Sequence, residues 1–585
     1  MSFAARFRAR SEHLDLAIAV VLGTAYLALL LATAHEIGYA RDEGFYFTAA
    51  EAYGAWFDLL LTDPPRALDE VDRYFAVNHE HPVLIKSLMA ISYRVLHQDL
   101  GWVEHPGTSY RIPGMLLGAL AVAVTYGWAA RLLGRLSALV GAVSLGMMPR
   151  FFFHAHLACF DIPVASMWLV TTAGYFWAVE RGGWGRVAIV GLLYGLLLNT
   201  KHNAWLLPPA LLVHWVLTRW ESFGRAMKTR SFTAVVPWPL IAMALVGPAV
   251  LWLTWPWLWH DTAERLSQWY EFHRHHVYYN MEFLGRTYFK PPMPRLYPWL
   301  MTAATVPAVT LALSLVGLIL AGRGALLRCN WAQLRRQRQT SAYSAAAQPA
   351  STQSSTQQSA YLLWGLCIVT SYAPWVSSET PIFGGTKHWI TAYPFVALFC
   401  ALGFRSVFSG ALATLQNHLR VTGARAQVMS ASMAATVVAG PMVMALSAPQ
   451  WGLSTYTPVV GGAPGAATLG LNRTFWGYTT GSVAAYLNRN VPPNQAVYVH
   501  DTALPSFKMM QRDGSLRGDL RASLSIAGSA AALYHHEPHM GRVEYQVWVN
   551  YGTTRPSYLG LCDGVPIVWV YLRPPGRPPD KQSPH

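Results

Sequence analysis

The chain has 585 residues, of which 53% are hydrophobic and 12% are charged, and its formal net charge is +15. Soluble domains carry about twice this share of charged residues. Several apolar runs reach the roughly 17–25 residues that a helix needs to cross a bilayer, so a soluble globular protein is excluded. The basic residues gather in short segments between these runs, as in cytoplasmic loops, which argues against a nucleic-acid partner.

These runs predict a polytopic α-helical membrane protein, because backbone groups in lipid must be hydrogen-bonded internally. The long runs are 14–34, 110–130, 235–257, 299–322, 388–404 and 430–447, and shorter or interrupted ones are 136–149, 162–179, 187–199, 203–218 and 360–376. The first is longer than the roughly 7–15 apolar residues of a signal peptide, so we expect an uncleaved helix. Stretch 82–97 contains Lys86, Arg94 and His97, which favours a position at the membrane surface. We expect about 11–12 membrane helices.

Placing the basic clusters in the cytoplasm fixes the orientation of the loops. The segments then expected outside the cytoplasm are 35–81, 258–298 and 377–387. The polar, low-complexity stretch 339–360 predicts a disordered cytoplasmic linker. We expect a transmembrane domain over residues 1–447.

Residues 448–585 differ in character from the rest, with mixed polarity and turn residues between short apolar runs. The strand-like runs are "QAVYVH" (495–500), "VEYQVWV" (543–549) and "VPIVWVYL" (565–572). They predict a small extracytoplasmic α/β or β-rich domain.

Adjacent carboxylates follow the first apolar run in "RDEGFY" (41–46), at the expected outer surface. A carboxylate there can act as general base on a hydroxyl, and cations such as Lys201, Lys387 and Arg286 can hold a phosphate. Histidines with Glu80 can hold a divalent metal. Together these groups fit sugar transfer from a polyprenyl-phosphate donor, whose tail lies in the bilayer.

Five segments, in this order, resemble the membrane glycosyltransferases of the GT-C fold. Within these, the chain resembles glycosyltransferase family 39, the protein mannosyltransferase and aminoarabinose lipid A transferase group. The segments are "RDEGFY" (41–46), "NHEHPVL" (78–84), "FFFHAHLACFDIPVASMWL" (151–169), "LLYGLLLNTKHNAWLL" (192–207) and "GGTKHWITAYPFVAL" (384–398). Two departures concern donor identity: Val83 replaces a proline of the family pattern, and the Arg often found before the second Asp is absent.

The resemblance implies roles for individual residues. Asp42 would be the catalytic carboxylate, Glu43 would tune it, and Asp161 would be a second carboxylate. Candidates for substrate binding are Arg41, His81, Lys201, His202, Arg286, Lys387 and His388, with the two lysines on the donor phosphate. Glu80, His273 and His276 would hold a divalent metal, Zn, Mg or Mn.

The expected function is transfer of one sugar from a polyprenyl-phosphate donor to a lipid, glycan or protein hydroxyl. The site would face the periplasm or outside of a bacterial inner membrane. One alternative is an oligosaccharide-transferring enzyme of the same fold. Another, from a different class, is a non-catalytic scaffold or transporter, but transporters show inverted repeats, and no repeat is visible here.

Overall fold

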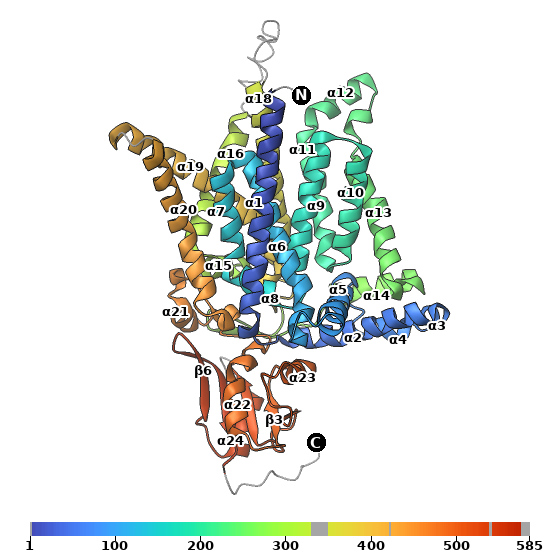
Figure 1. The fold of residues 1–585 in the computed structure, drawn as a ribbon, viewed down its shortest axis with the longest axis vertical. Coiled ribbons are helices and arrows are strands. Elements are labelled where there is room, and N and C mark those ends of the chain that lie inside the picture. The colour runs from blue at the N-terminus through green and yellow to red at the C-terminus, as the bar shows by residue number, and fades with distance from the viewer. Residues whose placement is uncertain (1–2, 329–348, 420–422, 537–540, 575–585) are drawn as a thin grey trace.

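The structure, a computed structural model, describes residues 3–328, 349–419, 423–536 and 541–574. It is a helical bundle with a small α/β domain at one end (Figure 1). The bundle helices are α1 (Phe3–Thr33), α6 (Pro106–Leu133), α7 (Arg135–Gly146), α8 (Pro149–His156), α9 (Asp161–Arg181), α10 (Trp184–Leu198), α11 (Leu207–Thr218), α13 (Trp238–Thr254), α15 (Tyr297–Thr305), α16 (Ala308–Arg328), α18 (Pro349–Tyr372), α19 (Tyr393–Leu419) and α20 (Gly423–Leu446).

By length and composition, six helices among the described residues can cross a membrane, or seven if the bent pair α7 and α8 forms one span. Three shorter apolar helices, α10, α13 and α16, stand beside them (Figure 1). The chain is therefore a multi-span membrane protein, as predicted. The expected 11–12 spans are not reached by this measure, since α10 and α13 have 15 and 17 residues and a full span needs about 20.

Further elements lie at the lower end of the bundle in Figure 1, the end that carries the C-terminal domain, and some of them extend sideways from it. They are α2 (Arg41–Thr62), α3 (Pro64–Asp69), α4 (Val71–Phe75), α5 (Leu84–Ser92) and α14 (Thr262–Arg274), followed by a hairpin of β1 (Met281–Phe283) and β2 (Arg286–Tyr288). The nine residues of α5 continue as a π-helix, Tyr93–Asp99, and the two together are still shorter than the roughly 20 residues of a span, which agrees with the surface position predicted for 82–97.

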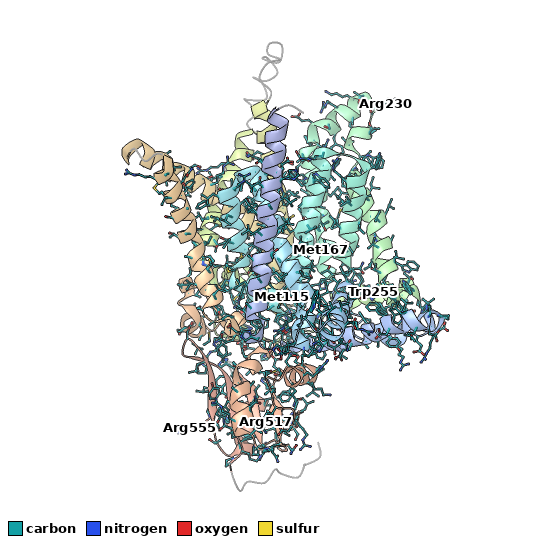
Figure 2. All side chains as sticks on the ribbon, in the orientation of Figure 1. Met115, Met167, Arg230, Trp255, Arg517 and Arg555 are labelled. Atoms are coloured by element: carbon teal, nitrogen blue, oxygen red, sulfur yellow. The ribbon has the colours of Figure 1, made fainter. Side chains whose placement is uncertain are left out.

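The opposite end carries the N-terminus and α12 (Trp220–Thr229), and Arg230 lies there, far from Arg517 and Arg555 of the C-terminal domain (Figure 2). The three loops predicted to lie outside thus share one end with residues 448–536 and 541–574, and a predicted basic cluster lies at the other.

The predicted disordered linker 339–360 is wrong where the structure describes it. Its residues 339–348 lie outside the described residues, whereas 349–360 form the start of α18. These residues continue directly into an apolar membrane helix, and an established helix extends at little cost once it is nucleated.

The C-terminal domain contains a five-stranded sheet of order β4-β3-β5-β7-β6. Its elements are α21 (Gly462–Thr468), α22 (Ala484–Asn490), β3 (Ala496–Val499), α23 (Leu504–Arg512), β4 (Arg521–Ser523), β5 (Ala531–His535), α24 (Arg542–Tyr551), β6 (Tyr558–Cys562) and β7 (Val565–Leu572). β3 pairs in parallel with both β4 and β5, and β7 pairs antiparallel with β5 and β6. The predicted α/β character is confirmed.

Two of the three strand predictions in this domain are confirmed, by β3 and β7. The third is wrong, because 543–549 lie in α24. Val547 and Tyr551 of α24 are buried, four residues apart on one helical face. Burial of one face of a helix therefore outweighs the strand propensity of the residues in this run.

Candidate active site

A cavity of about 740 Å³ opens where the lower end of the bundle meets the C-terminal domain. Residues from α2, from the loops after α4, α8 and α10, and from the loop before α19 line one side. The C-terminal domain lines the other side with Asn472, Thr474, Phe475, Trp476, His500, Asp501, His535 and His536. The site therefore combines segments separated by almost 500 positions in the chain.

Asp42 lies in the first turn of α2, where the positive end of the helix dipole favours a carboxylate. Its Oδ2 accepts a hydrogen bond from Trp476 Nε1 at 2.7 Å and lies 3.9 Å from Lys387 Nζ. Arg41 Nε lies 3.5 Å from Oδ1 and its Nη1 donates to Asp501 at 2.7 Å. The Asp42 side chain is 21% exposed, so the cavity reaches it.

Lys387 is carried by a tight turn, η7 (Gly385–His388), just before α19. His388 Nε2 accepts hydrogen bonds from the backbone N–H groups of Phe383 and Gly384, which fixes the turn. A Cβ at Gly384 would lie 1.8 Å from Lys387 Cε, so glycine is needed for the lysine to fold over this backbone. The Lys387 ammonium lies 3.9 Å from the centre of the Trp476 ring, and burial lowers its pKa while nearby Asp42 raises it.

The second carboxylate, Asp161, begins α9 and lines the same cavity. Lys201, from the break after α10, donates to Asp161 Oδ1 at 2.7 Å, and His154 Nδ1 lies 3.4 Å from Oδ2. Lys201 is thus paired with a buried carboxylate, whereas Lys387 is 3.9 Å from its nearest acid. Both predicted phosphate-binding lysines line the cavity, but the charge of Lys201 is compensated by a close carboxylate and that of Lys387 is compensated less.

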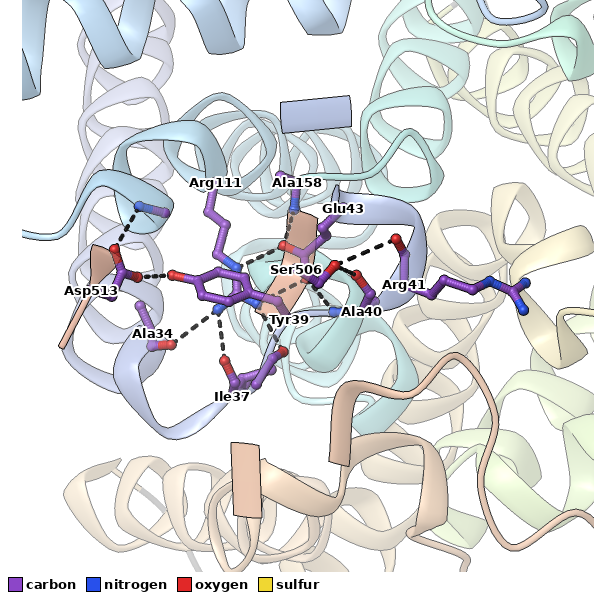
Figure 3. A network of polar contacts seen from close by, with 12 residues as sticks. Ala34, Ile37, Tyr39, Ala40, Arg41, Glu43, Arg111, Ala158, Ser506 and Asp513 are labelled. Carbon is purple, nitrogen blue, oxygen red and sulfur yellow. Dashed lines mark hydrogen bonds and ion pairs between the residues drawn. The ribbon is translucent and has the colours of Figure 1, made fainter. Parts of the chain in front are cut away.

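Glu43, predicted to assist catalysis, does not line the cavity, and its side chain is fully buried. Its Oε1 and Oε2 accept from Arg111 at 2.8 and 2.9 Å and from the backbone N–H groups of Ala158 and Ala40 at 2.9 and 2.7 Å (Figure 3). Arg111 also donates to the carbonyls of Ala34, Ile37 and Gly38. The carboxylate of Glu43 is therefore fully engaged in fixing the start of α2 against α6.

His81, His202 and His273 form an aromatic group on the bundle side of the cavity. The rings of His202 and His273 stack with centroids 3.8 Å apart, and His81 lies 5.9 Å from His273. Burial lowers the pKa of His81 and of His202 well below the usual range, and lowers that of His273 to about 4. At neutral pH these three imidazoles are uncharged.

The predicted metal ligands Glu80, His273 and His276 are near one another but do not form a ligand set. His273 Nε2 donates to the backbone carbonyl of Glu80 at 2.9 Å, and the Glu80 carboxylate accepts from Asn78 at 2.6 Å. The His276 ring stacks on Phe383, with centroids 4.4 Å apart. Within the described ranges, no three His, Cys, Asp or Glu side chains are placed to hold a metal ion.

Arg286, predicted to bind substrate, lies on β2 and is not among the residues that line the cavity. It is exposed and stacks on the ring of Tyr288, 5.0 Å from its centroid. The register of the hairpin pairs Arg286 with Phe283.

Several lining residues are missing from the predicted set: Trp476, His500, Asp501, His535 and His536. All five belong to the C-terminal domain, whose sequence contains no recognisable motif. Arg111 was also missed, although a charged residue inside an apolar segment is itself an indication of a structural or functional role.

Residues 80–252 match the family described as Dolichyl-phosphate-mannose-protein mannosyltransferase. This match confirms the resemblance indicated by the ordered motifs, over the segment that contains Glu80, Asp161 and Lys201. No curated protein matches the chain.

Several solved structures are similar to the chain. ArnT from Cupriavidus metallidurans bound to undecaprenyl phosphate has 14% identity and a TM-score of 0.43, over 96% of this chain and 98% of its own. The apo state of the same protein has 15% identity and a TM-score of 0.44, over 94% and 97%. The Archaeoglobus fulgidus oligosaccharyltransferase in its apo form has 10% identity and a TM-score of 0.48, over 93% and 72%.

Proposed function

We propose that this protein is a glycosyltransferase that moves a single sugar from a polyprenyl-phosphate donor to an acceptor hydroxyl. The observation that carries the proposal is the contact of Asp42 and Lys387 within one cavity, at the end of a membrane bundle. A base and a phosphate-binding cation side by side suit a displacement in which phosphate departs. The family match over 80–252 supports the same reaction class.

Asp42 accepts the proton of the acceptor hydroxyl while the hydroxyl oxygen attacks the anomeric carbon of the donor sugar. The bond between the anomeric carbon and the phosphate oxygen breaks, and its electrons leave with the polyprenyl phosphate. Lys387 lies near Asp42 and stabilises this negative charge as it develops. One displacement inverts the anomeric configuration.

The other cavity residues fit supporting roles. Lys201 is held by Asp161 at 2.7 Å, so this pair brings little net charge and can orient the donor by hydrogen bonds. Arg41 lies between Asp42 and Asp501 and holds the position of both carboxylates. The step as written uses protein groups alone, and the divalent metal stays a prediction that the chelator assay tests.

The size of the cavity favours transfer of one sugar over transfer of a large glycan. Its volume of about 740 Å³ is within the roughly 300–1,000 Å³ of small-molecule sites. We propose a bacterial inner membrane as the location. The cavity would face the periplasm or outside, because the basic cluster near α12 lies at the opposite end of the bundle.

The test is turnover of a panel of radiolabelled polyprenyl-phosphate sugars by the full-length protein in lipid nanodiscs. We expect one donor to react, with an inverted anomeric centre in the product. Lys387→Met should raise the KM for that donor or lower kcat by roughly tenfold or more, since a charge-assisted contact is lost.

Lys228→Met is the matched control, because Lys228 lies on α12 at the far end of the bundle. A retained anomeric configuration would contradict the single displacement. Equal activity of Lys387→Met and Lys228→Met would remove Lys387 from the phosphate site. Repeating the assay with a chelator tests the predicted divalent metal.

A further inference from the structure

The C-terminal sheet presents the ends of two neighbouring strands to the cavity. β3 and β5 run parallel and are paired through Val497–Ala531, Tyr498–Ala532 and Val499–Leu533. The residues at their carboxyl ends are His500 and Asp501 after β3, and His535 and His536 at the end of β5, and all four line the cavity. In α/β sheets, ligands bind at the carboxyl ends of parallel strands.

The hydrogen bonds of His535 fix which of its ring nitrogens can meet a ligand. Its Nδ1 lies 2.8 Å from the carbonyl of His500, which can only accept, so Nδ1 carries the proton. Burial lowers the pKa of His535 to about 3, so the ring is neutral and Nε2 is an acceptor. Within the described part of the chain, this Nε2 is buried without a hydrogen-bond partner.

Two further polar atoms on the same side of the cavity share this condition. His536 Nδ1 and Thr474 Oγ1 are buried and have no hydrogen-bond partner among the described residues. The His536 ring is held against Trp569, with centroids 5.4 Å apart and planes 22° apart, and burial lowers its pKa to about 3. Buried polar atoms normally have a hydrogen-bond partner, so we expect a bound molecule or water to hydrogen-bond to these three.

Few charged side chains line this side of the cavity. Among the described residues of the C-terminal domain that line it, Asp501 is the single carboxylate and there is no lysine or arginine. Arg41 neutralises Asp501 at 2.7 Å. Phe475 and Trp476 add aromatic surface beside the polar atoms. Neutral hydrogen-bonding groups with aromatic rings suit an uncharged molecule rich in hydroxyl groups.

We propose that the carboxyl edge of β3 and β5, with Thr474, forms the acceptor subsite, and that the acceptor is an uncharged carbohydrate. This inference rests on the proposed transferase function. The edge is adjacent to the base, because Asp501 binds Arg41 and Arg41 lies 3.5 Å from Asp42. The lysines and the membrane lie on the opposite side, where a lipid-linked donor enters. His535 Nε2 then accepts a hydrogen bond from an acceptor hydroxyl.

The test measures binding without turnover, using full-length donor-free protein in nanodiscs. The probes are uncharged methyl glycosides and trisaccharides, compared with a Ser/Thr-containing peptide and a long-chain alcohol, each followed by saturation-transfer NMR. We expect the saccharides to bind, and His535→Leu and Thr474→Val each to weaken their binding roughly fivefold to tenfold, the effect of one lost hydrogen bond.

His97→Leu is the matched control, because His97 Nδ1 also donates to a backbone carbonyl, that of Val103, and His97 does not line the cavity. It should bind saccharides as the wild type does. All variants are compared by thermal unfolding to confirm a wild-type fold.

Two results would overturn the inference. One is wild-type saccharide affinity in both His535→Leu and Thr474→Val. The other is binding of the peptide or the alcohol with no saccharide bound, which would leave the transferase function intact with another acceptor class. Conversely, saccharide binding lost in the variants, in a protein that turns over no donor, would support the subsite and reject the proposed function.

Discussion

Trp476 is the residue that ties the C-terminal domain most directly to the proposed chemistry. Its indole N–H donates a hydrogen bond to Asp42, and the Lys387 ammonium lies over the face of its ring in a cation–π contact. Its φ is +74°, a left-handed backbone conformation that is unfavourable for a bulky side chain. Strain of this kind persists where the surroundings hold it, and it is common at functional sites. We infer that Trp476 positions the base and the cation relative to each other.

Trp476→Phe should separate these two contacts, because phenylalanine keeps a ring but lacks the N–H. The Asp42 carboxylate then loses the hydrogen bond that fixes its Oδ2. We expect kcat/KM to fall roughly tenfold to a hundredfold.

Trp548→Phe is the control for this change, since Trp548 Nε1 donates to Tyr571 within the C-terminal domain. It removes an indole hydrogen bond without touching the cavity. If Trp476→Phe and Trp548→Phe both kept the kcat/KM of the wild type, Trp476 would have only a packing role.

Glu43 and Arg111 form an ion pair whose side chains are 0% and 1% exposed. Breaking a buried pair leaves one charge without compensation, which costs about 3–5 kcal/mol. Arg111→Met should therefore lower the free energy of unfolding by about this amount, measured by denaturant or thermal unfolding in detergent.

The double variant Glu43→Gln, Arg111→Met removes both charges and should be more stable than Arg111→Met alone. If the single variant Glu43→Gln unfolded like the wild type but had no transferase activity, the predicted catalytic role of Glu43 would be restored.

At the scale of elements, the approach of α2 to α23 holds the two halves of the site together. A Cβ on Gly44 of α2 would lie 2.6 Å from Ser506 Oγ and 2.7 Å from the Ser506 backbone nitrogen on α23. Ser506 Oγ also donates to the carbonyl of Ala40, which caps α2. The first turn of α2, with Asp42, is thus set by contact with the C-terminal domain.

Gly44→Ala should displace α23 and lower activity, whereas Gly54→Ala should not. Both glycines lie within α2, so both changes raise helix propensity by about 1 kcal/mol. Gly54 has only Ala90 Cβ near its added carbon, at 3.8 Å. Comparing thermal unfolding and kcat/KM between the two variants separates the effect of the contact with Ser506 from the change in helix propensity. If both variants had the same kcat/KM, the close approach of α2 to α23 would not be needed for activity.

The elements that could be predicted are those whose evidence is local. Four of the six long apolar runs coincide with helices that can cross a membrane, and β3 and β7 form where their patterns predict them. The other two runs, 235–257 and 299–322, form the shorter helix α13 and the separate helices α15 and α16. The 543–549 stretch failed because its β-favouring residues pack with a helical period in α24. The first turns of α18 were missed because low complexity describes composition and not the helix that follows.

At the scale of the whole molecule, the sequence predicts one half of the site and misses the other. Asp42, Asp161, Lys201 and Lys387 stand in ordered motifs, and basic loops place them at one end of the bundle. Trp476, Asp501 and His535 reach the cavity only through the docking of a domain more than 400 residues after Asp42. No local pattern encodes such long-range contacts.

The account's central claim is that Asp42 is the base of a sugar transfer. The most direct test is kcat/KM for the reactive polyprenyl-phosphate sugar in Asp42→Asn and in Asp58→Asn, with folding checked by thermal unfolding. Asp58 lies on the same helix but forms an exposed ion pair with Arg94. We predict a loss of roughly 10²–10⁴-fold for Asp42→Asn and nearly wild-type activity for Asp58→Asn. Nearly wild-type activity of a folded Asp42→Asn protein would contradict the account.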